Sequence, residues 1–307
     1  MGKLAVNIPW SGGEFRLNNP VLAASGTFGY GVEFASYGPL EALGGLVTKG
    51  LSLRPMPGNP MPRIAETPCG MLNSIGLQNC GLERFMREYL PRLPRNGPKI
   101  IANIYARNLA DFSELAATLS RAPGVAALEV NISCPNVEAG GLLFGQEARA
   151  AAGVTAAVKK FSGDLPVLVK LTPNVTDITE IARACADAGA DMLSCINTLS
   201  GMGVDVRSRR FLLARRIGGL SGAAVKPVAL RCVWQVAQAV SIPVIGVGGI
   251  YTAEDILEFI LVGAWAVQIG TANFSRPDRI FALPAELSAL MDELDIASCA
   301  AFRGTLA

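Results

Sequence analysis

Short apolar runs alternate with longer amphipathic stretches through most of the chain. The runs are rich in Val, Ile and Leu and show no strict apolar-polar alternation, which is typical of parallel strands buried on both faces. Eight runs predict eight strands: residues 21–24, 45–48, 100–104, 127–132, 167–171, 192–196, 244–247 and 266–269.

Two of the stretches between these runs carry clear helix signals. Asp177 and Thr252 each precede an apolar-periodic segment and have an acidic residue three positions later, which is capping-box spacing. Strands and helices that alternate along the chain predict a parallel sheet with helices outside, and eight strands indicate closure into a (β/α)8 barrel of the TIM type. An open, doubly wound sheet is the alternative.

Two short β-rich segments, residues 4–8 and 14–17, flank Gly12 and Gly13 near the N-terminus. Because glycine permits a tight reversal, they predict a β-hairpin that closes the bottom of the barrel. The 307 residues fall within the usual length of one such barrel, roughly 200 to 400 residues. We therefore expect residues 1–307 to form a single domain.

Composition narrows the possible function classes. Half of the residues are hydrophobic and 17% are charged, which is typical of a packed globular protein. The net charge of +2 is too small for a nucleic-acid surface or a polybasic membrane anchor. The longest apolar run, near residues 259–269, is interrupted and too short to cross a bilayer, and the N-terminus lacks the apolar core of a signal peptide. We expect small-molecule chemistry, without nucleic acid or membrane.

The chain contains no histidine, so proton transfer would fall to Cys, Lys, Asp, Glu or Tyr. Its seven cysteines are scattered and include no C-x-x-C pair. The sequence therefore predicts no disulfide framework and no metal site, whether zinc or iron-sulfur, and a cytoplasmic location that keeps thiols reduced.

A polar, proline-broken segment, Asn131-Ile-Ser-Cys-Pro-Asn136, comes where the apolar run before it ends. Cys134 offers a thiol or thiolate, Ser133 a hydroxyl, and Asn131 and Asn136 offer amides that both donate and accept hydrogen bonds. A lone cysteine at a strand end is more often a buried structural residue. The polar neighbours favour a site for a polar heterocyclic ligand instead.

Polar side chains stand at the ends of several other runs, and a barrel would gather them at one rim: Ser25, Lys49, Asn103, Asn131, Lys170, Asn197 and Thr198. The two lysines require an anionic partner, because burying an ammonium without one is costly. The proline-rich residues 54–63 and residues 138–141 also follow strand ends. We expect both as loops over the same face, with a passive connector as the alternative for each.

Glycine-rich segments follow the last two predicted strands, in residues 245–249 and 269–271. Barrels often bind phosphate there through backbone N–H groups, and glycine lets the backbone approach an anion closely. Residues 218–222, Gly-Gly-Leu-Ser-Gly, are a candidate third set of amides. Ordinary tight turns are the alternative.

Taken together, these segments resemble the dihydroorotate dehydrogenase family. The matching motifs occur in the family's order and spacing between about Asn19 and Phe274: residues 48–50, 73–77, 131–136, 196–198, 218–222 and 247–250. Cys134 and the detailed sequence of residues 136–145 resemble class 1B, the catalytic subunit of an NAD-linked enzyme.

The resemblance implies an FMN-binding barrel that oxidises (S)-dihydroorotate to orotate in pyrimidine biosynthesis. It implies that Cys134 is the base that removes the C5 proton while hydride leaves C6 for FMN. The implied substrate-binding residues are Lys49, Asn73, Ser74, Ile75, Gly76, Leu77, Asn131, Asn197 and Thr198. The implied FMN-binding residues are Ser25, Lys49, Gly50, Asn103, Asn131, Lys170, Ile196, Gly222, Gly248, Gly249, Gly270 and Thr271.

The resemblance also implies a homodimer within a heterotetramer, in which a separate subunit carries FAD and an iron-sulfur cluster and passes electrons to NAD. The related alternatives are a fumarate-linked class 1A enzyme and a dihydropyrimidine dehydrogenase domain. A flavin- or phosphate-binding module is the non-enzyme alternative, because one fold serves many functions. Cys185 and Cys232, on apolar helix faces, are predicted to be structural.

Overall fold

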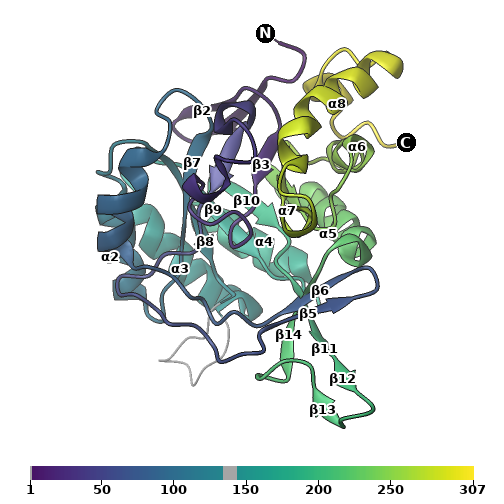
Figure 1. Ribbon diagram of the computed structural model, residues 1–307. Helices are drawn as coiled ribbons and strands as arrows, with labels where there is room; N and C mark the ends of the chain where they lie inside the picture. Colours follow the sequence, from purple (N-terminus) through teal and green to yellow (C-terminus); the bar gives the residue numbers. More distant parts are fainter. Residues whose placement is uncertain (1, 134–143) are drawn as a thin grey trace.

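The computed structural model describes residues 2–133 and 144–307, and its centre is a closed barrel of eight parallel strands (Figure 1). Around the ring, each strand pairs with the next one in the chain that belongs to the barrel, and the last pairs with the first. The barrel strands are β3 (Val21–Ala23), β4 (Gly45–Val47), β7 (Lys99–Ile104), β8 (Val125–Asn131), β9 (Val167–Leu171), β10 (Met192–Cys195), β15 (Val244–Val247) and β16 (Ala266–Ile269). The predicted (β/α)8 barrel is confirmed, and the open sheet is wrong.

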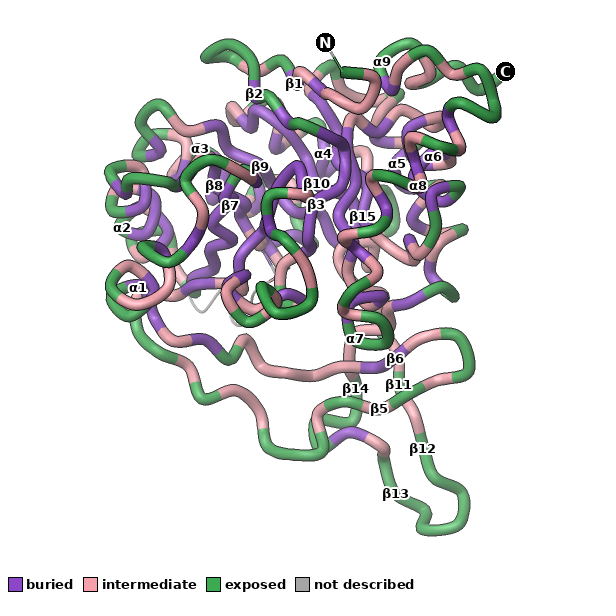
Figure 2. Tube along the Cα trace, turned by 45° about the horizontal axis from the view of Figure 1, so that its top comes forward, coloured by how far each residue is buried: buried purple, intermediate pink, exposed green. Residues whose placement is uncertain are grey.

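Burial explains why apolar runs predicted the barrel strands so well. β9, β10, β15 and β16 are buried at every position. A parallel strand that is covered by helices outside and by side chains inside must be largely apolar throughout. Figure 2 shows these buried strands at the centre and the exposed positions on the surrounding helices and loops.

Helices cover the outside of the barrel (Figure 1). The longer ones are α2 (Leu109–Leu119), α3 (Ala148–Phe161), α4 (Ile178–Asp187), α5 (Lys226–Ala239), α6 (Ala253–Leu261) and α8 (Arg279–Glu293), and the short ones are α1 (Leu82–Arg84), α7 (Ala272–Ser275) and α9 (Cys299–Phe302). Brief 3-10 turns and one π turn are η1 (Val32–Phe34), η2 (Leu40–Ala42), η3 (Phe85–Tyr89), η4 (Leu90–Arg92), η5 (Phe144–Gln146) and η6 (Ala223–Val225). None of the described helices has both the length and the apolar character needed to span a membrane.

The two helix starts predicted from the sequence differ in one detail. At α6, the Thr252 side chain accepts from the Asp255 amide at 3.1 Å while Asp255 accepts from the Thr252 amide at 2.9 Å, so the capping box is confirmed. At α4, Asp177 accepts from the Thr179 amide at 2.8 Å, and no described residue completes a reciprocal box. A carboxylate at this position suffices because it also suits the positive end of the helix dipole.

The N-terminal hairpin, β1 (Val6–Trp10) and β2 (Gly13–Leu17), lies at the end of the barrel where the strands begin (Figure 1). Asp191, which precedes β10, anchors it by accepting from Ser11 Oγ at 2.5 Å. Lys159 Nζ lies 2.5 Å from the other carboxylate oxygen and 5.4 Å from the centre of the Trp10 ring. The hairpin at the bottom of the barrel is therefore confirmed.

A second sheet stands at the opposite end of the molecule and was not predicted (Figure 1). Its antiparallel strands, in the order β11-β14-β6-β5, are β5 (Ile64–Thr67), β6 (Gly70–Asn73), β11 (Leu199–Met202) and β14 (Ile217–Ser221). A short exposed hairpin, β12 (Val204–Asp205) and β13 (Arg210–Phe211), extends beyond it (Figures 1 and 2).

The glycine-rich residues 218–222 correct one sequence interpretation. We considered these residues a candidate set of amides for an anion, with a turn as the alternative, but all except Gly222 belong to β14, which pairs with β11 on one side and β6 on the other. They are therefore part of an antiparallel ladder rather than of a turn. Glycine is needed for close packing, because a Cβ on Gly219 would lie 2.1 Å from Thr198 Oγ1.

Candidate active site

A cavity of about 850 Å³ lies at the carboxyl ends of the barrel strands. The residues that follow β3, β4, β10, β15 and β16 form its barrel side, and β6 and β14 of the second sheet contribute the other side. This is the end at which (β/α)8 barrels build their active sites, because the loops there can vary without disturbing the barrel.

Every predicted site residue in the described part of the chain lines this cavity. The barrel strands and their loops contribute Ser25, Lys49, Gly50, Asn103, Asn131, Lys170, Ile196, Asn197, Thr198, Gly248, Gly249, Gly270 and Thr271. The second sheet and its flanks contribute Asn73, Ser74, Ile75, Gly76, Leu77 and Gly222. Cys134 and the predicted loop 138–141 lie outside the described residues. The roles of all these residues stay predictions.

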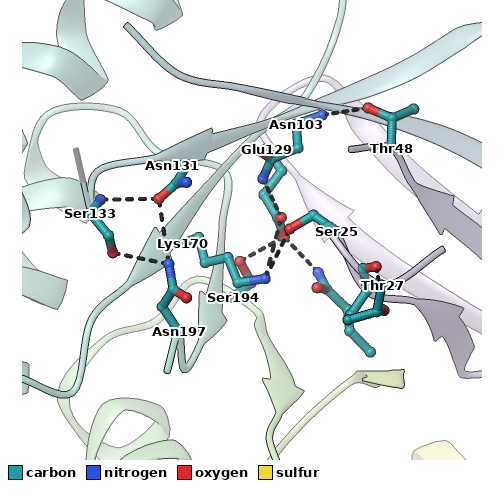
Figure 3. Close-up of polar contacts among 12 residues, drawn as sticks. Ser25, Thr27, Thr48, Asn103, Glu129, Asn131, Ser133, Lys170, Ser194 and Asn197 are labelled. Atoms are coloured by element: carbon teal, nitrogen blue, oxygen red, sulfur yellow. Dashed lines mark hydrogen bonds and ion pairs between the residues drawn. The ribbon is translucent and has the colours of Figure 1, made fainter. Parts of the chain in front are cut away.

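Three polar side chains at the ends of β8 and β10 fix one another (Figure 3). Asn131 Oδ1 accepts from the Ser133 amide at 3.1 Å and from Asn197 Nδ2 at 3.5 Å. Asn197 Nδ2 also donates to Ser133 Oγ at 3.0 Å. With its oxygen engaged in this way, Asn131 keeps an amide N–H2 group that donates to no described residue and is available to a ligand in the cavity.

A buried carboxylate lies among side chains from several barrel strands (Figure 3). Glu129 of β8 has no exposed surface. One of its oxygens accepts from Asn103 Nδ2 at 2.8 Å, and the other accepts from Ser194 Oγ at 2.8 Å and from Gln268 Nε2 at 2.6 Å. Three neutral donors from three different strands therefore stabilise one carboxylate in the core.

The two lysines of the cavity have different surroundings. Lys170 Nζ lies 3.8 Å from Glu129 Oε1 and donates to Ser25 Oγ at 3.3 Å. Lys49 forms no ion pair with any described carboxylate. Burial lowers the pKa of Lys49, and the positive charge of nearby Arg63 lowers it further. Among the described residues, the anionic partner that both lysines were predicted to need is thus present only for Lys170.

Backbone amides form part of the cavity wall after β15. Gly248 and Gly249 have φ angles of +131° and +73°, a region that L-residues with a side chain rarely adopt. Their amides donate to no described residue. Unpaired N–H groups in such a turn suit an anion such as phosphate.

One side chain of the second sheet also lacks a partner. Asn73 Nδ2 donates to the Gly219 carbonyl at 3.2 Å, which ties the end of β6 to β14. The hydroxyl oxygen of the next residue, Ser74, is buried and has no hydrogen-bond partner among the described residues. A buried hydroxyl without a partner is unfavourable, so a polar ligand in the cavity would relieve this cost.

The family model described as dihydroorotate dehydrogenase matches residues 4–291 of the chain. The chain belongs to the dihydroorotate dehydrogenase family. Among its relatives, the catalytic subunit of dihydroorotate dehydrogenase B (NAD+) from Solidesulfovibrio magneticus is 67% identical over 94% of this chain and 95% of its own length. The proteins of the same name from Maridesulfovibrio salexigens and Geotalea uraniireducens are 58% and 54% identical, over 98% and 100% of this chain and 98% and 99% of their own lengths.

In this member of the dihydroorotate dehydrogenase family, sequence reasoning missed residues that shape the cavity. Glu129 was one, because a single charge within an apolar run carries no local pattern. Asn174 was another: it donates to the Thr198 carbonyl at 2.9 Å and accepts from the Ser200 amide at 2.8 Å, which joins the second sheet to the barrel. Arg63 lines the cavity at the end of the proline-rich loop, so that loop is more than a passive connector.

Burial affects several of the other described cysteines of this dihydroorotate dehydrogenase family chain. Cys185 and Cys232 are buried, as predicted, and burial raises the pKa of both thiols, that of Cys185 to about 11. Burial likewise raises the pKa of Cys195 and Cys80. Within the ranges that the structure describes, no group of three or more His, Cys, Asp or Glu residues is arranged to hold a metal ion.

Proposed function

We propose that this chain is the catalytic subunit of an NAD-linked dihydroorotate dehydrogenase, which oxidises dihydroorotate to orotate in pyrimidine biosynthesis. The observation that carries the proposal is one cavity, in a barrel of this family, that gathers two lysines, a fixed cluster of amides and a turn of unpaired backbone N–H groups. The names of the relatives support the NAD-linked class.

FMN is the cofactor that we propose for this cavity, and the residues present fit it. The unpaired amides of Gly248 and Gly249 would bind its phosphate, assisted by the hydroxyl of Thr271. Lys170 would lie beside the isoalloxazine ring, where a positive charge stabilises the reduced, anionic form. When bound, FMN accepts the hydride that leaves C6 of dihydroorotate.

The remaining polar groups would bind the substrate. Asn131 and Asn197 are held in fixed orientations and would recognise the carbonyl and N–H groups of the pyrimidine ring. The Ser74 hydroxyl would gain the partner that it lacks. Lys49 would pair with the substrate carboxylate, which would supply the negative charge that no described residue provides.

Cys134 is the proposed base. With no histidine in the chain, a thiolate is a suitable group to take the C5 proton, and the substrate then loses one proton and one hydride. Ser133, the preceding residue, lines the cavity. After residues 134–143 the chain returns to the same place, because the Gly145 amide donates to the Ile132 carbonyl at 2.7 Å. Both observations support a base at the cavity.

Transfer of electrons to NAD requires a further subunit. The relatives' name, "catalytic subunit", supports a partner chain for this protein too. We propose that the partner carries FAD and an iron-sulfur cluster, and that two catalytic chains form a dimer within a heterotetramer.

The experiment is anaerobic mixing of the FMN-loaded chain with dihydroorotate while the absorbance of oxidised flavin is followed. Rapid bleaching is expected, reversed by NAD only after the iron-sulfur partner is added. Cys134→Ala should slow bleaching about 10² to 10⁴-fold, whereas the matched control Cys69→Ala, which removes an exposed thiol, should react like wild type.

Each alternative predicts a different outcome. Reoxidation by fumarate without a partner would indicate the class 1A enzyme. Bleaching by an uncharged dihydropyrimidine but not by dihydroorotate would indicate the dihydropyrimidine dehydrogenase reaction. A flavin-loaded chain that reacts with neither would be a binding module, and the proposal would be wrong.

A further inference from the structure

We infer that Glu129, which does not itself line the cavity, is a positioning residue that sets the reduction potential of the bound flavin through Lys170 and Asn103. The inference rests on the proposed FMN binding. It assigns a role in the electron-transfer chemistry to a side chain that makes no contact with the ligand.

The burial of Glu129 demands an explanation. Its side chain has no exposed surface, and its partners Asn103, Ser194 and Gln268 come from β7, β10 and β16. Such polar networks are often less stable than apolar side chains of the same volume, and one that persists in a barrel core is a candidate for a functional role. Gln268 also leaves its own carbonyl oxygen buried without a described partner, because its amide N–H2 group is turned toward Glu129.

The first effect of Glu129 passes through Lys170. Lys170 Nζ lines the cavity and lies 3.8 Å from Glu129 Oε1, so the carboxylate offsets part of the positive field that the lysine presents to a ligand (Figure 3). A positive field favours the reduced, anionic flavin. Glu129 therefore holds the flavin potential below the value that Lys170 alone would give.

The second effect passes through Asn103. The amide nitrogen of Asn103 donates to Glu129, so its oxygen is turned toward Gly50, where it would lie 2.9 Å from a Cβ on that glycine. Both Asn103 and Gly50 line the cavity. Glu129 thus fixes Asn103 as a hydrogen-bond acceptor toward the ligand, and loss of the carboxylate would free the amide to turn over.

The test is a redox titration of FMN bound to the full-length chain, against a dye of known potential. Glu129→Gln keeps the size of the side chain and removes the charge. It should raise the ratio of reduced to oxidised flavin about tenfold at a given potential, which corresponds to a shift of about 30 mV for a two-electron couple. Glu129→Asp keeps the charge but moves it away from Lys170, and it should give a smaller shift in the same direction.

Asp191→Asn is the matched control. Asp191 is also a carboxylate paired with a lysine, with a side chain that is 2% exposed, but it lies at the opposite end of the barrel beneath the hairpin. This variant should lower the melting temperature and leave the flavin potential unchanged. A purely structural role for Glu129 predicts the same behaviour for the Glu129 variants.

Three results would decide the matter against the inference. An unchanged potential in FMN-loaded Glu129→Gln would overturn it, and so would an equal shift in Asp191→Asn. If Glu129→Gln does not fold, the Glu129→Asp chain decides, and an unchanged or lowered potential there would overturn the inference. None of these results bears on the proposed function, which fails only if the wild-type chain binds no FMN or dihydroorotate does not reduce it.

Discussion

The cavity has two basic corners that differ in how their charge is balanced. Lys170 lies over Glu129, and its side chain is only 6% exposed. Lys49 is influenced by the positive charge of Arg63, and no described carboxylate forms an ion pair with it. A buried ammonium needs a negative partner, and among the described residues only Lys170 has one, which supports the proposal that a ligand supplies the partner of Lys49.

This difference distinguishes a lysine that is paired within the protein from a lysine that has no described anionic partner. The Lys170 corner is complete before any ligand binds, because its network of hydrogen bonds belongs to the barrel core. At the Lys49 corner no described residue supplies an anion, and this supports the proposal that Lys49 binds the carboxylate of the substrate. Stability measurements on the ligand-free chain should therefore distinguish the two residues more sharply than activity does, since both variants would be poor enzymes.

The largest expected difference is between Lys170→Met and Lys49→Met in the FMN-free chain. Lys170→Met leaves Glu129 as a buried charge without a cation, and it should lower the free energy of unfolding by about 3 kcal/mol. Lys49→Met removes an ammonium that has no ion-pair partner among the described residues, so the free energy of unfolding should stay the same or rise. Urea unfolding followed by circular dichroism measures both.

A double variant provides the control for this prediction. Glu129→Gln combined with Lys170→Met removes both charges, so it should recover much of the stability that Lys170→Met loses. Equal losses in Lys170→Met and Lys49→Met would show that the two corners do not differ, and the comparison would then be wrong.

Local sequence patterns were enough for the barrel and for much of the cavity wall. Each barrel strand is an apolar run whatever its neighbours are, and each polar residue at a strand end is visible as a break in such a run. The topology then brings these polar residues together, because the carboxyl ends of all parallel strands lie at the same end of a barrel. For this reason Lys49, Asn131 and Lys170 could be placed at one site from the sequence.

The difference between the two corners could not be predicted in this way. Glu129 stands inside an apolar run, and its partners Asn103, Ser194 and Gln268 lie far away in the sequence on other strands. The second sheet was missed for a related reason. Its strands are half-exposed and rich in glycine, as in β14, and such segments resemble turns until their pairing partners are known.

The pH dependence of stability gives a smaller effect that isolates Lys49. In the unfolded chain its pKa is near the usual 10.5, and in the folded chain it is lower. Between the two values the unfolded chain binds more protons, so the free energy of unfolding should rise with pH in that range. Below both pKa values the cost of burying the charge is fully present. The rise should amount to about 1.4 kcal/mol for each unit by which the pKa is lowered.

Urea unfolding of the ligand-free chain at a series of alkaline pH values measures this contribution. Lys49→Met should lack the rise. Saturating orotate should also suppress it, because a bound carboxylate favours the charged lysine. If the free energy of unfolding changes with alkaline pH in the same way for Lys49→Met and wild type, Lys49 has an ordinary pKa. The proposal that Lys49 binds the substrate carboxylate would then lose its physical basis.

Arg63→Gln should produce the smallest effect. It tests whether the positive charge of Arg63 contributes to the lowered pKa of Lys49. Arg63 is the lesser of the two causes that lower the pKa of Lys49, and it is only partly buried. Its removal should move the alkaline rise toward higher pH. Arg54→Gln, which removes an exposed charge on the same loop, should leave the rise in place.

Because salt screens partly exposed charges, the difference between wild type and Arg63→Gln should shrink in high salt while the effect of burial remains. A difference that does not depend on salt would mean that Arg63 acts by shaping the loop, and burial alone would then explain the lowered pKa of Lys49.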